Sequence, residues 1–265
     1  MSTNFSELLQ SAIELSETAA EEILKVYNSE YSVQQKEDKT PLTSADMAAH
    51  RTIVSGLKKL SPDIPILSEE ASKISFEERK QWTTYWLVDP LDGTREFIKR
   101  NGEFTVNIAL IENHLPIIGV IYTPVTGVCY YGMKGTGAFK MEKGQSAEKI
   151  SVRPAPKERI LVAGSRSHQD KSLEQFLLNV GEHELINMGS SLKSCLVAEG
   201  KVDIYPRLGP TSEWDTGAAQ CIVEEAGGFL TTTDMKQMRY NTKSSLLNPH
   251  FLVYGDDSVD WSSFI

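Results

Sequence analysis

The chain has 265 residues, of which 40% are hydrophobic, and it carries a formal net charge of -9 at pH 7. This length allows one large domain or two closely packed halves, and the negative charge argues against general binding to nucleic acid or anionic lipid. No stretch approaches a membrane span, and Glu7, Glu14 and Glu17 stand where a signal peptide would need a cationic and then an apolar run. We therefore expect a soluble cytoplasmic protein without a transmembrane segment.

The three cysteines, Cys129, Cys195 and Cys221, lie far apart and lack the Cys-x-x-Cys spacing. Free cysteine usually behaves as a small hydrophobic residue, so we expect buried free thiols.

The first predicted element is an amphipathic helix over about residues 5–27, where apolar residues recur at helical spacing. The polar segment 34–41 that follows is typical of a loop or hairpin, and such loops often close over a site. A second helix is predicted over about residues 43–60. Asp46 stands at the acidic position of a capping box at its start.

A short predicted strand at residues 65–67 leads into two adjacent acids, Glu69 and Glu70. Only one of two neighbours in extended chain can point inward. Taken alone, such a pair is ordinarily exposed at the surface.

The most informative stretch is Trp-Leu-Val-Asp-Pro-Leu-Asp-Gly-Thr at residues 86–94. An apolar strand delivers Asp89 and Asp92 into a tight turn at the start of a helix. Pro90 fixes the turn so that the two carboxylates converge, and the Leu91 carbonyl offers a further oxygen. Mg²⁺ prefers such ligands, usually one or two carboxylates with water and substrate phosphate. An Asp-rich turn that only caps a helix is the alternative.

The rest of the chain divides into two parts with different patterns. Three apolar segments separated by turns predict an antiparallel β-meander, at residues 104–112, 117–123 and 128–132. The polar stretch 141–149 then separates the halves, so we place a boundary between subdomains at 145/146. Alternating strands and helices predict an α/β second half, with strands near 160–163, 185–186 and 251–254 and helices over 172–180 and 192–199.

The string from Asp89 to Thr94 resembles the signature of the inositol monophosphatase superfamily of Mg²⁺-dependent, Li⁺-sensitive phosphatases. A second signature of that family, Trp-Asp with small residues and a later Gly-Gly, is matched at residues 214–219 and 227–228, and its acidic pair is matched at 69–70. The resemblance implies the α+β class and a layered α/β/α/β/α sandwich. Its antiparallel-sheet half would be residues 1–145 and its mixed α/β half residues 146–265, with the site between them.

The chain also resembles, in particular, the CysQ-type 3′(2′),5′-bisphosphate nucleotidase branch of this family, in segments 97–107, 165–168, 189–200 and 205–207. This likeness implies hydrolysis of adenosine 3′,5′-bisphosphate to AMP and phosphate, which clears a by-product of sulfate assimilation. An inositol or sugar monophosphatase on the same scaffold and a non-catalytic metal or phosphate sensor stay as alternatives.

The resemblance further implies roles for single residues. Two or three Mg²⁺ ions would be held by Glu69, Asp89, Asp92, Asp215 and the Leu91 carbonyl. One ion would activate a water that Thr94 orients together with Asp46 or Glu69, and another would stabilise the leaving oxygen. Simple helix capping by Asp46 and Asp215 is the alternative interpretation of those two residues.

A nucleoside bisphosphate presents a second phosphate that needs cationic and hydroxyl donors away from the metals, for which Arg and Lys are suited. The expected substrate-binding residues are Gly93, Thr94, Ser165, Arg166, Ser190, Ser191, Lys193 and Arg207, with His168 as a weaker candidate. Each could instead be an ordinary surface charge or cap. We expect a monomer with a small-molecule nucleotide substrate and no nucleic acid partner, and the family resemblance also allows peripheral association with the inner membrane.

Overall fold

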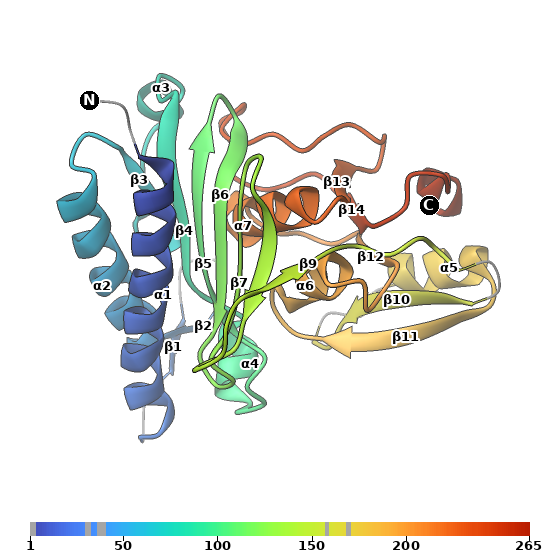
Figure 1. Ribbon diagram of the computed structural model, residues 1–265, viewed down its shortest axis with the longest axis horizontal. Helices are drawn as coiled ribbons and strands as arrows, with labels where there is room; N and C mark the ends of the chain where they lie inside the picture. Colours follow the sequence, from blue (N-terminus) through green and yellow to red (C-terminus); the bar gives the residue numbers. More distant parts are fainter. Residues whose placement is uncertain (1–3, 30–32, 36–40, 157–158, 168–170) are drawn as a thin grey trace.

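The computed structural model describes residues 4–29, 33–35, 41–156, 159–167 and 171–265, and within them two large β-sheets alternate with layers of helices (Figure 1). Helices α1 (Phe5–Tyr27) and α2 (Ser44–Leu60) cover the outer face of the first sheet. Helices α6 (Leu192–Ala198) and α7 (Glu213–Glu225) lie between the two sheets. Helix α5 (Lys171–Val180) and the 3₁₀ helix η2 (Trp261–Phe264) lie beyond the second sheet. The expected α/β/α/β/α layering is confirmed.

The first sheet has seven described strands in the order β3-β4-β5-β6-β7-β8-β9. Its pairings are antiparallel except for β3 with β4. The strands are β3 (Ile66–Ser68), β4 (Thr84–Asp92), β5 (Thr105–Glu112), β6 (Leu115–Thr123), β7 (Val128–Met133), β8 (Gly137–Met141) and β9 (Glu148–Ile150).

The second sheet has five described strands in the order β11-β10-β12-β14-β13, with parallel pairing around β10 and antiparallel pairing around β14. The strands are β10 (Ile160–Ser165), β11 (His183–Met188), β12 (Ile204–Arg207), β13 (Phe229–Thr232) and β14 (Phe251–Tyr254). This mixture of parallel and antiparallel pairing agrees with the predicted mixed α/β second half.

The amphipathic pattern of α1 explains why that helix packs on the first sheet. Its buried side chains recur at helical spacing and meet apolar side chains of α2, β4, β5 and β6 in one core. Burying each large apolar side chain in such a core contributes about 1.5–3 kcal/mol. The buried apolar residues of α1 are Leu8, Ala12, Ile13, Ala19, Ala20 and Ile23.

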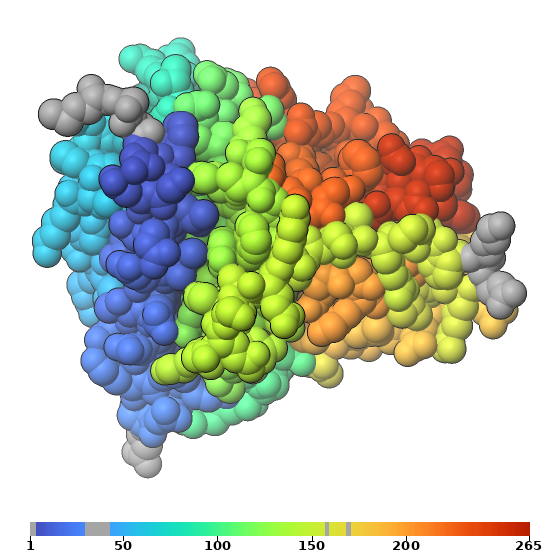
Figure 2. Space-filling model, in the orientation of Figure 1, coloured from blue at the N-terminus to red at the C-terminus, as the bar shows by residue number. Residues whose placement is uncertain are grey.

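Helix α7 joins the two halves of the molecule. It contacts β4, β5, β6 and β7 of the first sheet and β13 of the second. At Gly119 on β6 the helix comes so close that an added Cβ would lie 2.3 Å from the Ala218 carbonyl oxygen. In the space-filling view the orange part of the chain, which includes α7, lies directly against the green strands of the first half (Figure 2). The start of α7 is therefore held at a fixed place above the first sheet.

The polar stretch 141–149 is not the linker that its composition predicts. It contains the end of β8 and most of β9, so the first sheet extends to Ile150, past the predicted boundary at 145/146. β9 is an edge strand whose residues Glu148 and Lys149 are exposed, and a polar edge strand has the composition of a loop. The division into two subdomains stays a prediction.

Three short elements connect the main ones: the 3₁₀ helix η1 (Glu69–Ala71), α3 (Phe76–Arg79) and α4 (Thr94–Ile98). Strands β1 (Val33–Gln35) and β2 (Pro41–Thr43) pair antiparallel, which agrees with the predicted hairpin. Residues 36–40 of the predicted loop lie outside the described part of the chain.

Candidate active site

Asp89 and Asp92 lie at the end of β4, on one face of it because of a bulge. The pairing of β4 with β5 steps from Asp89↔Asn107 to Asp92↔Thr105, three residues on β4 against two on β5. Without the bulge, residues three apart on a strand would point to opposite faces. The extra residue falls in the segment that contains Pro90, which is where proline is tolerated in a sheet. Because of the bulge, the side chains of the two aspartates point to the same face of β4 and their carboxylates lie close together.

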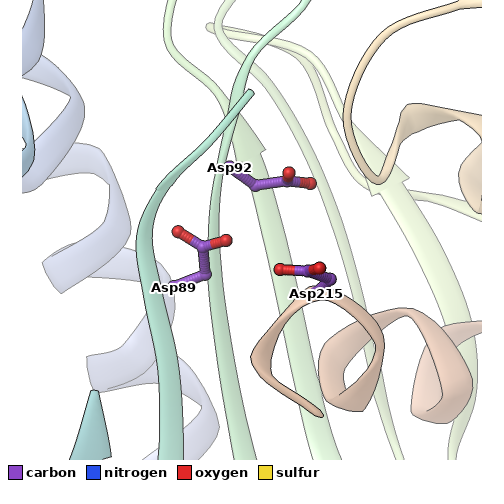
Figure 3. Close-up of side chains that lie close together, drawn as sticks. All are labelled: Asp89, Asp92 and Asp215. Carbon is purple, nitrogen blue, oxygen red and sulfur yellow. The ribbon is translucent and has the colours of Figure 1, made fainter. Parts of the chain in front are cut away.

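Asp215 supplies the third carboxylate from the first turn of α7. Its oxygens and those of Asp89 and Asp92 come within 4.8 Å of one another, and Figure 3 shows the three side chains around one space. Asp215 also caps its helix, because its Oδ2 accepts the Ser212 N–H at 2.9 Å. Asp215 therefore both caps α7 and belongs to the carboxylate cluster.

The cluster has the electrostatics of a cation site. Burial, followed by the charge of Glu69, raises the pKa of Asp89 well above its usual range. Burial, followed by the charge of Asp92, raises the pKa of Asp215 to about 8. Buried like charges are unfavourable unless a cation neutralises them. The donors are all carboxylate oxygens, which suits a hard cation such as Mg²⁺, so the residues present fit the metals that the sequence predicts.

The remaining predicted ligands are Glu69 and the Leu91 carbonyl. Glu69 follows directly after β3, which pairs with β4, and it lines the same cavity as the three aspartates, whereas Glu70 does not line that cavity. This agrees with the expectation that only one acid of the pair points inward. Leu91 also lines the cavity, and its N–H donates to Asp89 Oδ1 at 3.0 Å.

Asp46, in the first turn of α2, is buried next to Thr94 and does not itself line the cavity. Its Oδ2 accepts hydrogen bonds from the Thr43 N–H at 2.7 Å and the Thr43 hydroxyl at 2.6 Å, which completes a capping box. Its Oδ1 accepts the Thr94 hydroxyl at 3.2 Å, and Thr94 Oγ1 lies 3.5 Å from the Leu91 carbonyl oxygen. The carboxyl of Asp46 therefore caps a helix with one oxygen and faces Thr94 with the other.

The cavity has a volume of about 250 Å³ and is lined by residues of both halves. Most of the predicted substrate-binding residues line it: Gly93, Thr94, Ser165, Ser190, Ser191, Lys193 and Arg207. Arg166 does not. Its guanidinium forms an ion pair with Glu103, with contacts of 2.7 and 2.8 Å, and its side chain is 44% exposed. His168 lies outside the described residues.

Three cationic side chains line the cavity: Arg95 of α4 in the first half, and Lys193 and Arg207 in the second half. Lys193 is only 5% exposed, and burial lowers its pKa to about 8. Its Nζ donates to the carbonyl oxygens of Met188 and Ser190 and lies 5.2 Å from the centre of the Tyr205 ring. Arg207 donates to the Pro210 carbonyl at 2.9 Å, while its buried Nε has no hydrogen-bond partner in the described chain. The cavity thus has an acidic side and a cationic side.

Two residues that support the acidic side were not predicted individually. Thr105 and Asn107 are buried on β5 opposite Asp92 and Asp89, and the Thr105 hydroxyl donates to Asn107 Oδ1 at 2.9 Å. A signal was present in the sequence, because these two polar residues stand two apart in a strand whose other residues up to Ile111 are apolar. Residues two apart on a strand point to the same face, so both side chains lie on the face that carries Asp89 and Asp92.

The comparisons with known proteins agree with this geometry. The model of the inositol monophosphatase family matches residues 4–255. The chain belongs to the inositol monophosphatase family. A curated relative, the 3′(2′),5′-bisphosphate nucleotidase CysQ of Salmonella typhimurium, is 48% identical over 93% of this chain and 99% of its own length.

Solved structures of family members have the same fold. The structure of CysQ from Bacteroides thetaiotaomicron matches with a TM-score of 0.84 and 41% identity over 95% of this chain and 98% of that one. An inositol monophosphatase from Anabaena matches with a TM-score of 0.78 and 26% identity over 98% and 95%. Both agree with the predicted fold class. None of the helices in the described ranges combines the length and the apolar character that crossing a membrane would require.

Proposed function

We propose that the protein is a Mg²⁺-dependent 3′(2′),5′-bisphosphate nucleotidase that hydrolyses adenosine 3′,5′-bisphosphate to AMP and phosphate. The observation that carries this proposal is the division of a single cavity into an acidic side and a cationic side. A substrate with one phosphate at the metals and another some distance away fits both sides. The relatives that are 46–48% identical over 93% of the chain carry the same activity in their names.

The acidic side would hold two or three Mg²⁺ ions through Glu69, Asp89, Asp92, Asp215 and the Leu91 carbonyl. When bound, Mg²⁺ supplies an activated water and stabilises negative charge on the leaving oxygen. The remaining contributions come from the chain itself.

Thr94 and Asp46 form a proton path at the edge of the cavity. Because the Thr94 hydroxyl donates its hydrogen to Asp46 Oδ1, the lone pairs of Thr94 Oγ1 are free to accept a hydrogen bond from the attacking water. Transfer of a proton from that water to Thr94 and from Thr94 to Asp46 would end on a carboxylate whose position is fixed by the Thr43 cap. Glu69, beside Asp89, is the second predicted acceptor.

Lys193 and Arg207 would bind the phosphate that is not cleaved. Lys193 offers a compact positive charge in a buried position, where an ion pair is screened little by solvent. Ser165 lines the same side and can donate a hydroxyl hydrogen. This part of the site would distinguish a nucleoside bisphosphate from an inositol monophosphate, which needs no second anion site.

The same proposal includes inhibition by Li⁺, a place in sulfur metabolism, a cytoplasmic location and a monomeric state. Li⁺ inhibition is tested within the substrate assay below. The monomeric state is tested by size-exclusion chromatography with light scattering, where a mass near 29.5 kDa is expected.

The substrate proposal is tested by measuring phosphate release from adenosine 3′,5′-bisphosphate, inositol 1-phosphate and fructose 1,6-bisphosphate. Each substrate is assayed with Mg²⁺, with EDTA and with Mg²⁺ plus Li⁺. We expect the highest kcat/KM for the nucleotide, no turnover in EDTA and inhibition by Li⁺. A preference for the inositol ester would indicate a monophosphatase instead, and release from none of the three would indicate a sensor.

A further inference from the structure

Only one oxygen of the Asp92 carboxylate, Oδ2, accepts hydrogen bonds from the described residues. Its Oδ2 accepts the Ser191 N–H at 2.7 Å, the Ser191 hydroxyl at 2.7 Å, the Ser190 hydroxyl at 3.0 Å and the Asn107 amide at 3.4 Å. Every hydrogen bond that Asp92 accepts from the described residues ends on this oxygen. A carboxylate oxygen has two lone pairs, so these donors saturate Oδ2 and leave Oδ1 for the space shared with Asp89 and Asp215.

Ser191 is the centre of this arrangement. Its hydroxyl lies 2.7 Å from Asp92 Oδ2 and 3.0 Å from the Asp215 carbonyl oxygen, and it accepts the Asn107 amide N–H at 2.9 Å. A hydroxyl has one hydrogen, and the bond to a charged acceptor is the stronger one, so Ser191 donates to Asp92. One buried side chain of the second half thus contacts two of the predicted metal ligands, which come from β4 and α7.

The turn that presents Ser190 and Ser191 is itself fixed by the first half. Ser190 has a φ of +54°, a conformation that non-glycine residues rarely adopt. The preceding Gly189 donates its N–H to the Glu103 carboxylate at 2.8 Å, and a Cβ added there would lie 2.7 Å from the Glu103 carbonyl oxygen. Thr105 Oγ1 also lies 2.6 Å from Ser190 Oγ. Strained backbone that is held by several contacts is common at functional sites.

We propose that Ser191, assisted by Ser190, is a positioning residue for Asp92: it fixes Oδ2 so that Oδ1 faces the cation, and it does not bind the substrate. This inference rests on the proposed metal centre and changes the predicted role of the two serines. It also means that the metal site is complete only when the second half of the chain is packed against the first.

The test is the affinity of the metal-free protein for Mn²⁺, measured by electron paramagnetic resonance in the absence of substrate. Removing a partner that orients a metal ligand typically lowers metal affinity about 10- to 100-fold. We expect a loss of this size for Ser191→Ala and a smaller one for Ser190→Ala, which leaves both Ser191 donors in place. The KM for adenosine 3′,5′-bisphosphate at saturating Mg²⁺ should change less than about twofold in both variants.

Ser16→Ala is the matched control, because Ser16 is a buried serine of helix α1 whose hydroxyl donates to the Ile13 carbonyl at 2.7 Å and which does not line the cavity. It should leave Mn²⁺ affinity unchanged. If Ser191→Ala does not fold in the absence of metal, as judged by circular dichroism, Ser190→Ala provides the test. Unchanged Mn²⁺ affinity in a folded variant, or a rise in KM at saturating metal, would overturn the inference. Failure of the wild-type protein to bind Mn²⁺ would instead contradict the proposed metal centre.

Discussion

Thr94 Oγ1 lies 3.2 Å from Asp46 Oδ1. This hydrogen bond joins the start of α4, which follows β4, to the start of α2. The other oxygen of Asp46 accepts two hydrogen bonds from Thr43. The cap therefore does more than stabilise α2, because it fixes a buried carboxylate that receives the hydroxyl hydrogen of Thr94. Oδ2 of Asp46 thus has a structural role in the cap and Oδ1 a chemical role beside Thr94, and a substitution that keeps the first but not the second can test them separately.

Asp46→Asn should lower kcat by about 10²- to 10⁴-fold, the range expected for loss of a group that accepts a proton. The stability should fall much less, because Asp46 is the N3 residue of the capping box and the amide oxygen of asparagine can still accept the Thr43 N–H there. Steady-state kinetics with adenosine 3′,5′-bisphosphate and thermal unfolding of the same preparation measure both effects.

A matched control for that experiment is Ser75→Ala in α3, where the Ser75 hydroxyl accepts the Glu78 N–H at 3.2 Å. Loss of this cap should cost about 1 kcal/mol of stability and leave kcat unchanged. If Asp46→Asn behaved like Ser75→Ala, Asp46 would be a cap and nothing more.

The buried Lys193 predicts a pH dependence of substrate binding. Its pKa is about 8, lowered by burial, so the side chain is a cation below pH 8 and loses its charge as the pH rises through that value. The KM for adenosine 3′,5′-bisphosphate should therefore rise between pH 7 and pH 9, while the KM for adenosine 3′-monophosphate, which lacks the second phosphate, should rise much less. Lys193→Met should raise the KM for the bisphosphate about 10- to 100-fold at pH 7. A parallel rise for both substrates would show that Lys193 does not bind the second phosphate.

The stability of the metal-free protein should fall as the pH rises from 5 to 8.5. The pKa of Asp215 is about 8 in the folded chain and that of Asp89 is also raised, so the folded state holds protons that the unfolded state has already lost. Stability present at low pH is then lost as the pH passes through the folded-state values. Thermal unfolding in EDTA measures the slope.

Saturating Mg²⁺ should remove most of this slope, because the cation binds the ionised carboxylates of the folded state. Asp215→Asn should flatten the slope without metal, because asparagine does not titrate. The helix start should be kept, since the asparagine oxygen can still accept the Ser212 N–H. A Tm that rises with pH in EDTA would contradict the electrostatic description of the cluster.

The ion pair of Arg153 with Asp203 predicts a loss of stability that leaves the chemistry intact. Asp203 is fully buried, contacts Arg153 at 2.8 and 3.0 Å, and accepts the Leu161 N–H at 2.6 Å. Asp203→Ala should cost about 3 kcal/mol, at the low end for a broken buried pair because Arg153 keeps access to solvent.

Denaturant unfolding measures that loss, and kcat should stay at the wild-type value because Asp203 does not line the cavity. Glu22→Gln, which breaks the exposed pair of Glu22 with Lys25, is the control and should leave stability unchanged. Equal effects of the two substitutions would show that burial of the pair does not matter.

The sequence predicted those parts of the fold that local patterns determine. The helix predicted over 5–27 and the strand before Asp89 match α1 and β4, because periodicity and the turn residues of one segment suffice for each. The edge strand β9 was read as a linker, since exposed polar residues give no such pattern.

The site was predictable only in part for the same reason. The meeting of Asp215 with Asp89 and Asp92 depends on how α7 packs across the first sheet, and the family likeness rather than the residue pattern indicated it. The ion pair between Arg166 and Glu103 and the contact of Ser191 with Asp92 join segments 63 and 99 residues apart. No local pattern specifies such partners, so neither the pairing of Arg166 with Glu103 nor the contact of Ser191 with Asp92 could be predicted from the sequence.

In the proposed function, the gathered carboxylates make phosphate hydrolysis depend on a divalent cation. Its most direct test is the initial rate of phosphate release from adenosine 3′,5′-bisphosphate as Mg²⁺ is added to the metal-free protein. We expect no release before addition and a saturable rise with Mg²⁺, which Asp92→Asn shifts to higher concentration or abolishes. Release at the full rate in EDTA, or no release at any Mg²⁺ concentration, would contradict it.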